Sequence, residues 1–426
     1  MLLEFGLSNW KSFKEENFIS TISSREEQHN ERRANIPKFS MNVLPAAGIF
    51  GGNASGKSNL IDALYFIRNL IVDYPSIQSL IPVKKYELDE KTRYEPTEFY
   101  LQMLIDDNIY HLTIELDEKR ILREKLEFEN SSRKHLLYDR DKESIVLGKK
   151  YKDNNTLTTI ARGTRSNRLF LSNTIDQQEL EFEKVFNWFK NLIILSPDGF
   201  QRLDNLYIEE YICALNEFLP LLDTGVKRVN FKQIDINNLS MPKEIINQFL
   251  NEFETTNSTS AVISGRGGII YMFEKNEDNG INVNELITIH ESADGEVEFK
   301  ILKESMGTRQ AMELIPLFYN LTRTPSVVII DEIDRSLHTA MTSGLIKYFL
   351  NNYESNSRSQ LIFTSHDTNL FTQEIFRRDE LWVVERNKYN ESNIVSVGDF
   401  KDVKKNHNLE SLYLQGRLGG TPRINI

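Results

Sequence analysis

Cysteine is almost absent from this chain of 426 residues, which contains only Cys213. A single cysteine cannot form a disulfide within the chain, and it excludes a zinc site built from several thiolates. Cys213 lies in an apolar-periodic stretch between residues 206 and 222. We therefore expect it to be buried as a small hydrophobic side chain.

The chain also lacks long hydrophobic runs and an excess of positive charge. No apolar stretch approaches the roughly 20 residues that a transmembrane helix needs, and the N-terminus does not resemble a signal peptide. We therefore expect a cytoplasmic protein that does not contact membranes. The net charge of −11 argues against non-specific coating of nucleic acid, although local basic patches could still bind it.

One segment, Gly51-Gly52-Asn53-Ala54-Ser55-Gly56-Lys57-Ser58, matches the phosphate-loop pattern G-x-x-x-x-G-K-[ST] at every fixed position. The apolar run 46–50 before it predicts a buried strand, and apolar residues at helical spacing follow over 59–74. Such a turn points backbone N–H groups and the helix dipole at a phosphate. Lys57 would contact the β- and γ-phosphates of ATP, and Ser58 would bind Mg²⁺. The predicted nucleotide-binding residues here are Gly51, Asn53, Ala54, Ser55, Gly56, Lys57, Ser58 and Asn59.

Two adjacent carboxylates, Asp331 and Glu332, end the apolar run 327–330. Adjacent strand residues point to opposite sides, so the two acids can have different roles. We expect Asp331 to bind the hydration shell of Mg²⁺, and Glu332 to act as the catalytic base that polarises water. A second apolar strand, 361–364, leads to His366, which would reach the same edge of a parallel sheet as the phosphate loop. There His366 would sense the γ-phosphate or orient the attacking water.

The order of these motifs resembles that of ABC-type ATPase heads. Glu304-Ser305-Met306-Gly307-Thr308-Arg309-Gln310 is similar to their signature loop, although an acid is common at the position of Met306. The resemblance implies that Ser305, Gly307 and Thr308 close over the nucleotide of the opposite subunit, with 334–338 as the D-loop and His366 as the H-loop. The opening Leu7-Ser8-Asn9-Trp10-Lys11-Ser12-Phe13 resembles that of SMC and RecF-like heads, which implies that Lys11 lies near the nucleotide.

Two segments narrow the resemblance within this superfamily. The phosphate-loop region 50–60 and the closing Tyr413-Leu414-Gln415-Gly416-Arg417-Leu418-Gly419-Gly420-Thr421-Pro422 look most like compact bacterial ATPases of abortive-infection systems. These are the AbiLi/RloA type, of the AAA_15/AAA_21 group, and the related PARIS and Septu subunits. The resemblance implies a slow, regulatory ATP hydrolase that forms a homodimer or higher oligomer. It would control a separate effector protein, often a nuclease, in anti-phage defence. The alternative is a RecF- or SMC-like ATPase that acts directly on DNA in repair or recombination.

The fold class that we expect is α/β. It comprises an ABC ATPase head with a mixed sheet around the phosphate loop, an antiparallel β subdomain and an inserted helical subdomain. Residues 1–75 would form the N-terminal lobe and residues 303–426 the C-terminal lobe. Residues 76–302 would hold the two inserted subdomains, with helices over 177–257. Alternating helices and strands over 308–398 indicate parallel strands with crossover helices.

Overall fold

The computed structural model describes residues 1–73, 80–131, 133–196, 208–239, 243–255, 259–264, 269–276, 280–403 and 407–421. The chain divides into two compact units, which we describe separately. Unit 1 comprises Met1–Phe200, Thr324–Ile333 and Leu350–Ile426, and unit 2 comprises Gln201–Arg323 and Asp334–Phe349.

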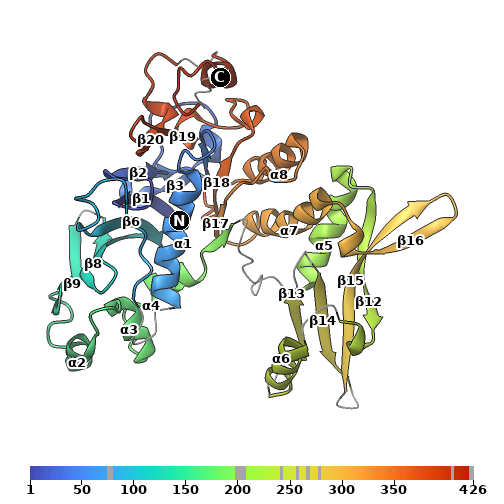
Figure 1. Ribbon diagram of the computed structural model, residues 1–426, viewed down its shortest axis with the longest axis horizontal. Coiled ribbons are helices and arrows are strands. Elements are labelled where there is room, and N and C mark those ends of the chain that lie inside the picture. The colour runs from blue at the N-terminus through green and yellow to red at the C-terminus, as the bar shows by residue number, and fades with distance from the viewer. Residues whose placement is uncertain are drawn as a thin grey trace. The chain divides into compact units, whose positions relative to one another are not determined.

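A six-stranded sheet in unit 1 has the order β11-β17-β18-β5-β19-β20. The first five strands run parallel to their neighbours, and β20 pairs antiparallel to β19 (Figure 1). Every residue of β5, β17 and β18 is buried, which explains the continuous apolar sequences of β5 and β17 and the apolar centre of β18. The predicted mixed sheet around the phosphate loop is confirmed. Its strands are β5 (Ala46–Phe50), β11 (Ile193–Leu195), β17 (Val327–Ile330), β18 (Gln360–Ser365), β19 (Leu381–Arg386) and β20 (Ser392–Ser396).

The predicted antiparallel hairpins form a second sheet in unit 1, with the order β10-β9-β8-β7-β6-β1-β2. A turn at Asp106 and Asp107 joins β6 to β7, as the polar residues between the two alternating segments indicate. The strands are β1 (Leu2–Ser8), β2 (Asn17–Ser20), β6 (Thr97–Ile105), β7 (Asn108–Leu116), β8 (Ile121–Asn130), β9 (Arg133–Asp141) and β10 (Ser144–Leu147). A short pair, β3 (Ala34–Ile36) and β4 (Met41–Val43), stands apart from it.

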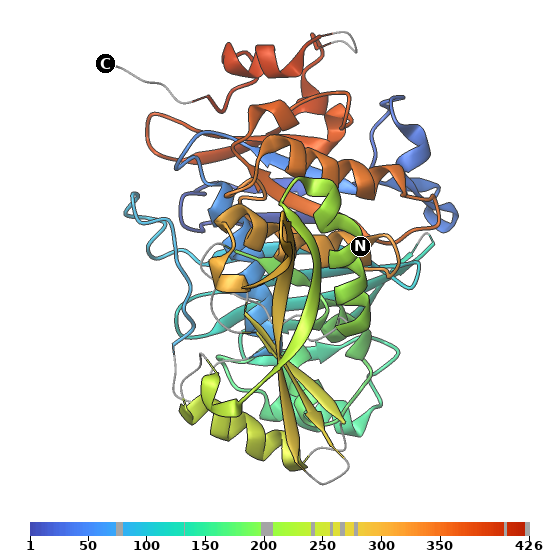
Figure 2. The same cartoon turned by 90° about the vertical axis from the view of Figure 1, so that its right-hand side faces the viewer.

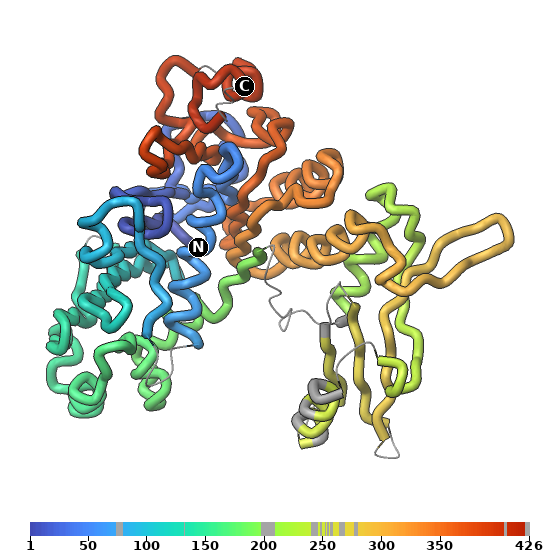
Figure 3. Tube along the Cα trace, in the orientation of Figure 1, coloured from blue at the N-terminus to red at the C-terminus, as the bar shows by residue number. Residues whose placement is uncertain are grey.

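A fully buried glutamine, Gln360, links these two sheets. Its Oε1 accepts from the backbone N–H of Leu2 at 2.8 Å, and its Nε2 donates to the carbonyls of Leu2 and Leu44 at 3.1 and 3.2 Å. The N-terminal strands and the C-terminal strands of unit 1 thus lie side by side, with β2 against β20 (Figure 3). The helices of unit 1 are α1 (Lys57–Val72), α2 (Asn155–Gly163), α3 (Phe170–Asp176), α4 (Glu183–Lys190) and α9 (Leu409–Leu414).

Unit 2 contains an antiparallel sheet of order β12-β15-β14-β13, with β16 also paired to β15 (Figure 2). Its strands are β12 (Val226–Ile234), β13 (Ser260–Ser264), β14 (Ile270–Lys275), β15 (Ile281–Ser292) and β16 (Gly295–Lys300). Its helices are α5 (Ile208–Phe218), α6 (Lys243–Thr255), α7 (Met306–Leu321) and α8 (Thr339–Asn351), and the last two residues of α8 belong to unit 1. A small core around Phe253, Tyr271 and Phe273 packs α6 against this sheet.

The helical prediction for residues 177–257 is wrong at β11 and at β12. In β12 the buried residues Val226 and Val229 are three positions apart, a spacing that suggests a helix. The pairing with β15 shifts its register between Val226 and Arg228, and such a bulge adds one residue to the strand. Both valines therefore reach the same buried face of a strand.

The predicted burial of Cys213 is also wrong, because its side chain is exposed. Helix α5 buries Tyr211, Ala214, Leu215 and Phe218, which recur at helical spacing and form its apolar face. Cys213 falls between two of these positions and thus on another side of the helix. In the described part of the chain, no helix has the length and apolar character needed to span a bilayer.

Candidate functional site

The phosphate-loop segment connects β5 to α1, as the sequence predicts. Gly56 precedes the first turn of α1 with a φ of 117°. A Cβ at this position would lie 2.4 Å from the Oγ of Ser392 and 2.9 Å from the Oγ of Ser12. The loop is therefore so closely packed against neighbouring chain segments that only glycine fits at position 56.

Lys57 and His366 lie close together at the carboxyl ends of β5 and β18. The buried ammonium of Lys57 donates to the carbonyl oxygens of Gly51 and Gly52 at 2.7 and 3.1 Å. Its Nζ lies 3.4 Å from Nδ1 of His366, whose side chain is exposed. The parallel sheet thus brings together two side chains that are 309 positions apart, at the edge where such sheets bind ligands.

The two predicted acids share one partner, Thr364. The Thr364 hydroxyl donates to Oδ1 of the buried Asp331 at 2.5 Å and accepts from the backbone N–H of Glu332 at 2.7 Å. The carbonyl of Thr364 accepts from the N–H of Ile333 at 3.0 Å. Sequence reasoning assigned no role to Thr364. The available signal was a hydroxyl residue directly after the apolar run Leu361-Ile362-Phe363, two positions before His366.

Glu332 has a left-handed backbone, with a φ of 57°. A residue with a side chain pays about 1–3 kcal/mol for such a conformation, so it persists only where neighbouring contacts enforce it. The hydrogen bonds from Glu332 and Ile333 to Thr364 supply that constraint. Strained residues of this kind cluster at functional sites, and this one follows the carboxyl end of a buried strand.

The phosphate loop fits an anionic ligand. The hydroxyl of Ser55 is buried and has no hydrogen-bond partner among the described residues, so a donor stands ready beside Lys57. The side chains of Asn53, Ala54 and Ser58 are exposed. No group of three or more acidic, histidine or cysteine side chains in the described ranges could hold a metal ion by itself. Mg²⁺ would therefore need phosphate oxygens as further ligands, as is usual for this ion.

Lys11, in the N-terminal loop, and Asn59, in α1, both make contacts that join this loop to the helix. The ammonium of Lys11 pairs with the carboxylate of Asp62 on α1. The side-chain amide of Asn59 donates to the Oγ of Ser12 at 2.7 Å, and its backbone carbonyl accepts from Nε1 of Trp10 at 2.9 Å. Both residues thus fix the N-terminal loop to the helix that follows the phosphate loop. Their contact with a nucleotide stays a prediction.

The signature residues lie in unit 2, whereas the phosphate loop, Asp331, Glu332 and His366 lie in unit 1. Ser305 caps α7, because its Oγ accepts from the backbone N–H of Thr308 at 3.0 Å. A Cβ at Gly307 would lie 2.8 Å from the carbonyl oxygen of Ser336. The first turn of α7 therefore packs directly on the predicted D-loop.

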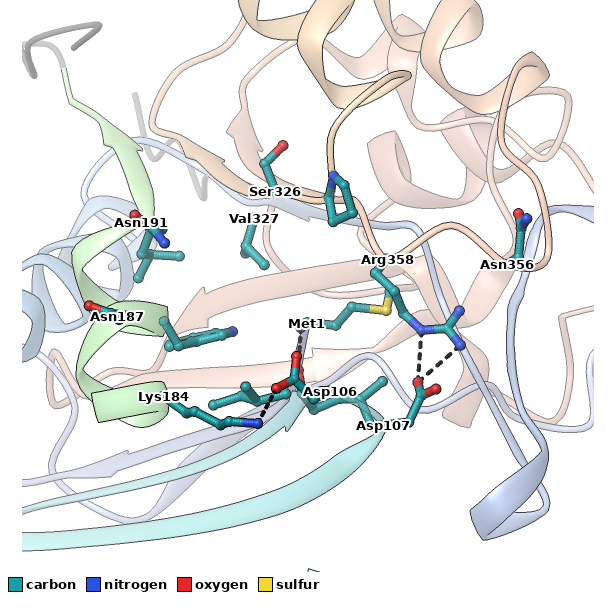
Figure 4. A pocket seen from close by; sticks show the side chains of 15 residues that line it. Met1, Asp106, Asp107, Lys184, Asn187, Asn191, Ser326, Val327, Asn356 and Arg358 are labelled. Atoms are coloured by element: carbon teal, nitrogen blue, oxygen red, sulfur yellow. Dashed lines mark hydrogen bonds and ion pairs between the residues drawn. The ribbon is translucent and has the colours of Figure 1, made fainter. Parts of the chain in front are cut away.

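Unit 1 has a cavity of about 620 Å³ at the amino end of β17, where Val327 is one of the lining residues (Figure 4). None of the predicted site residues lines it. Ion pairs of Lys184 with Asp106, at 2.6 Å, and of Arg358 with Asp107, at 3.1 Å, border it. The parallel strands place it opposite the edge that holds Lys57 and His366, so it is a different site.

Comparison with known proteins gives a family and weak structural likenesses. The SMC head domain from Thermotoga maritima matches 93% of this chain and 98% of its own, at 14% identity and a TM-score of 0.37. An SmcHead structure bound to the C-winged helix domain of ScpA matches 93% and 97%, at 14% identity and a TM-score of 0.36. Both TM-scores are below 0.5, so the fold is assigned from the order and direction of the strands and not from these two structures. No curated protein matches the sequence.

The family model that matches covers residues 46–372, from the first residue of β5 to just beyond His366. This range holds the phosphate loop, both acids and the signature segment. The chain therefore belongs to the AAA_21 family, which is described as "AAA domain, putative AbiEii toxin, Type IV TA system".

Proposed function

We propose that the chain binds ATP with Mg²⁺ at the phosphate loop of unit 1 and hydrolyses it slowly, as a regulatory step. The observation that carries the proposal is that Nζ of Lys57 lies 3.4 Å from Nδ1 of His366. Both side chains lie at the same edge of the sheet as the two acids, Asp331 and Glu332, that are hydrogen-bonded to Thr364. A cation and a helix N-terminus bind phosphate groups, and carboxylates and an exposed imidazole can bind Mg²⁺ or position the attacking water in phosphoryl transfer.

Each of these groups has a separate role in the proposed reaction. Lys57 exchanges its contacts with the loop carbonyls for the β- and γ-phosphates. Glu332 accepts a proton from the water whose oxygen attacks the γ-phosphorus, while the bond from phosphorus to the bridging oxygen of ADP breaks. His366 contacts the γ-phosphate and orients this water. Mg²⁺, held by Ser58 and Asp331, would neutralise charge on the phosphate oxygens.

A second copy of the chain completes the site in this proposal. Ser305, Gly307 and Thr308 begin α7, whose first backbone N–H groups favour an anion. They would close over the γ-phosphate bound to the phosphate loop of the partner. ATP, but not ADP, would then stabilise the homodimer, and hydrolysis would release it.

The dimer would control a separate effector protein, such as a nuclease, in bacterial defence against phage. The family description names a putative toxin of a type IV toxin–antitoxin system, and the separate effector and the role against phage are our proposal alone. The alternative is an ATPase that acts on DNA directly. DNA-stimulated hydrolysis with a steep dependence on salt would favour that alternative, because DNA binding releases counterions.

The test begins with calorimetric titration of ATP into the wild type, Lys57→Ala and Lys38→Ala, an exposed lysine in the same unit. We expect loss of measurable affinity only in Lys57→Ala. Glu332→Gln should bind ATP as a stable dimer without turnover. A mixture of Lys57→Ala and Ser305→Arg chains should regain hydrolysis, because one intact site forms in each heterodimer. Equal affinity in Lys57→Ala, or no recovery although heterodimers form, would contradict the proposal.

A further inference from the structure

The C-terminal segment of unit 1 contacts the phosphate loop directly. Helix α9 is followed by a turn that ends at Gly420, whose carbonyl oxygen accepts from the backbone N–H of Gly52 at 2.7 Å. The same oxygen accepts from the phenol of Tyr413 at 3.2 Å. The closing segment noted in the sequence, described as far as Thr421, is thus hydrogen-bonded to the backbone of the phosphate loop. Pro422 lies outside the described residues.

The contact is closely fitted at Gly420. This residue has a φ of 71°, and a Cβ on it would lie 2.3 Å from Cγ1 of Val383 on β19. A side chain there would force the turn away from β19. Glycine is therefore needed for the Gly420 carbonyl to reach the loop.

Aromatic contacts fix the same segment to both sides of the site. The ring of Tyr413 lies 4.9 Å from that of Phe371, which in turn lies 4.9 Å from that of Phe50. Phe50 directly precedes the phosphate loop, and Phe371 follows His366 by five positions. Thr368 lies between His366 and Phe371 in the sequence, and its hydroxyl donates to Glu410 of α9 at 3.3 Å.

We propose that residues 413–420 form a C-terminal clamp that positions the phosphate loop for nucleotide, with Gly420 and Tyr413 as positioning residues. The inference rests on the proposed function. Gly52 is held at its N–H by Gly420 and at its carbonyl by Lys57. When the ammonium of Lys57 turns to a phosphate, it gives up the Gly52 carbonyl. The clamp then keeps the loop in its binding conformation, which lowers the ordering cost of binding.

The experiment compares two matched pairs of chains. The first pair consists of two shortened chains, and the second of two full-length variants. One pair is a chain that ends at Gln415, which keeps Tyr413 but lacks residues 416–420 of the clamp, and a chain that ends at Thr421, which keeps the whole clamp. The other is Gly420→Ala and Gly225→Ala, which both place alanine at positive φ, but Gly225 lies in unit 2. In addition, Tyr413→Phe removes one hydrogen bond and keeps the ring. Chains shown to be folded at 25 °C are used.

Two measurements are made on each chain: hydrogen exchange of phosphate-loop peptides without nucleotide, and ATP affinity by calorimetry. Loss of the clamp should speed exchange of the loop amides and raise the Kd of ATP about five- to tenfold, as expected for one lost hydrogen bond. Tyr413→Phe leaves the hydrogen bond between Gly52 and Gly420 in place, so it should raise the Kd only about twofold to threefold. The chain that ends at Thr421 and Gly225→Ala should match the wild type in both measurements.

Normal exchange and normal ATP affinity in the clamp variants would overturn the inference. If the chain that ends at Gln415 does not fold, Gly420→Ala and Tyr413→Phe decide the question by the same two measurements. A wild type that does not bind ATP would contradict the proposed function. Exchange of the loop amides would then still show whether residues 413–420 hold the loop.

Discussion

Thr364→Val tests whether one hydroxyl positions both acids of the site. Valine has nearly the shape of threonine but can neither donate to Asp331 nor accept from the N–H of Glu332. Thr364 is fully buried, so water cannot readily replace either hydrogen bond. The substitution therefore removes two interactions without creating a cavity.

The expected loss of stability follows from these two hydrogen bonds. A buried polar group left without a partner costs about 1–3 kcal/mol, and here two groups lose theirs. The additional buried methyl group returns about 1 kcal/mol, which leaves a net loss of roughly 1–5 kcal/mol. Glu332 also loses a constraint on its left-handed backbone. A base displaced by about 1 Å can cost on the order of a hundredfold in rate, so turnover should fall far more than ATP affinity.

Urea denaturation and steady-state hydrolysis measure the two effects, with Thr364→Ser as the control. Serine keeps the hydroxyl and loses one methyl group, so it should cost about 1 kcal/mol and keep most of the activity. If the Thr364→Val variant were as stable and as active as the Thr364→Ser variant, the reasoning would be refuted, because the hydroxyl would then contribute nothing.

Three further predictions concern other residues. Burial raises the pKa of Glu380 from 4.5 to about 8, so the folded chain holds a proton that the unfolded chain releases, and stability falls as pH rises between these values. Glu380→Gln should therefore gain stability relative to the wild type between pH 5 and 8.5 in urea titrations, and a constant difference would contradict the shift. Gly307→Ala should lower hydrolysis without changing ATP affinity, because its Cβ would displace the carbonyl of Ser336; unchanged turnover would exclude a need for this close approach. Glu124→Ala should cost about 3–5 kcal/mol in the same titrations, because Arg140 stays buried without its carboxylate; a cost below about 1 kcal/mol would count against it.

The elements that the sequence predicts best are those whose pattern has one structural solution. Strands β5 and β17 are continuous apolar runs next to a phosphate loop and to paired acids, and both appear where expected. In β12, by contrast, a bulge changes the spacing of Val226 and Val229, and only the pairing with β15 reveals it. Spacing cannot separate a bulged strand from a short helix.

Long-range contacts explain what sequence reasoning misses at the site. The segment that ends at Gly420 is recognisable by its glycines, but nothing local indicates that its carbonyl meets Gly52. Thr364 is similar, since its importance depends on a neighbouring strand that ends in two acids. Motifs identify groups that react with a ligand, whereas the residues that hold those groups are found through tertiary structure.

The position of β5 in its sheet also affects how the chain is made. Both neighbours of this strand, β18 and β19, are encoded more than 300 residues later. At typical rates of translation, roughly 20–70 s pass between synthesis of β5 and of β19. During that interval the backbone N–H and C=O groups on both edges of β5 lack their partners, so the nascent chain is expected to need a chaperone, and nucleotide cannot assist folding until β19 has been made.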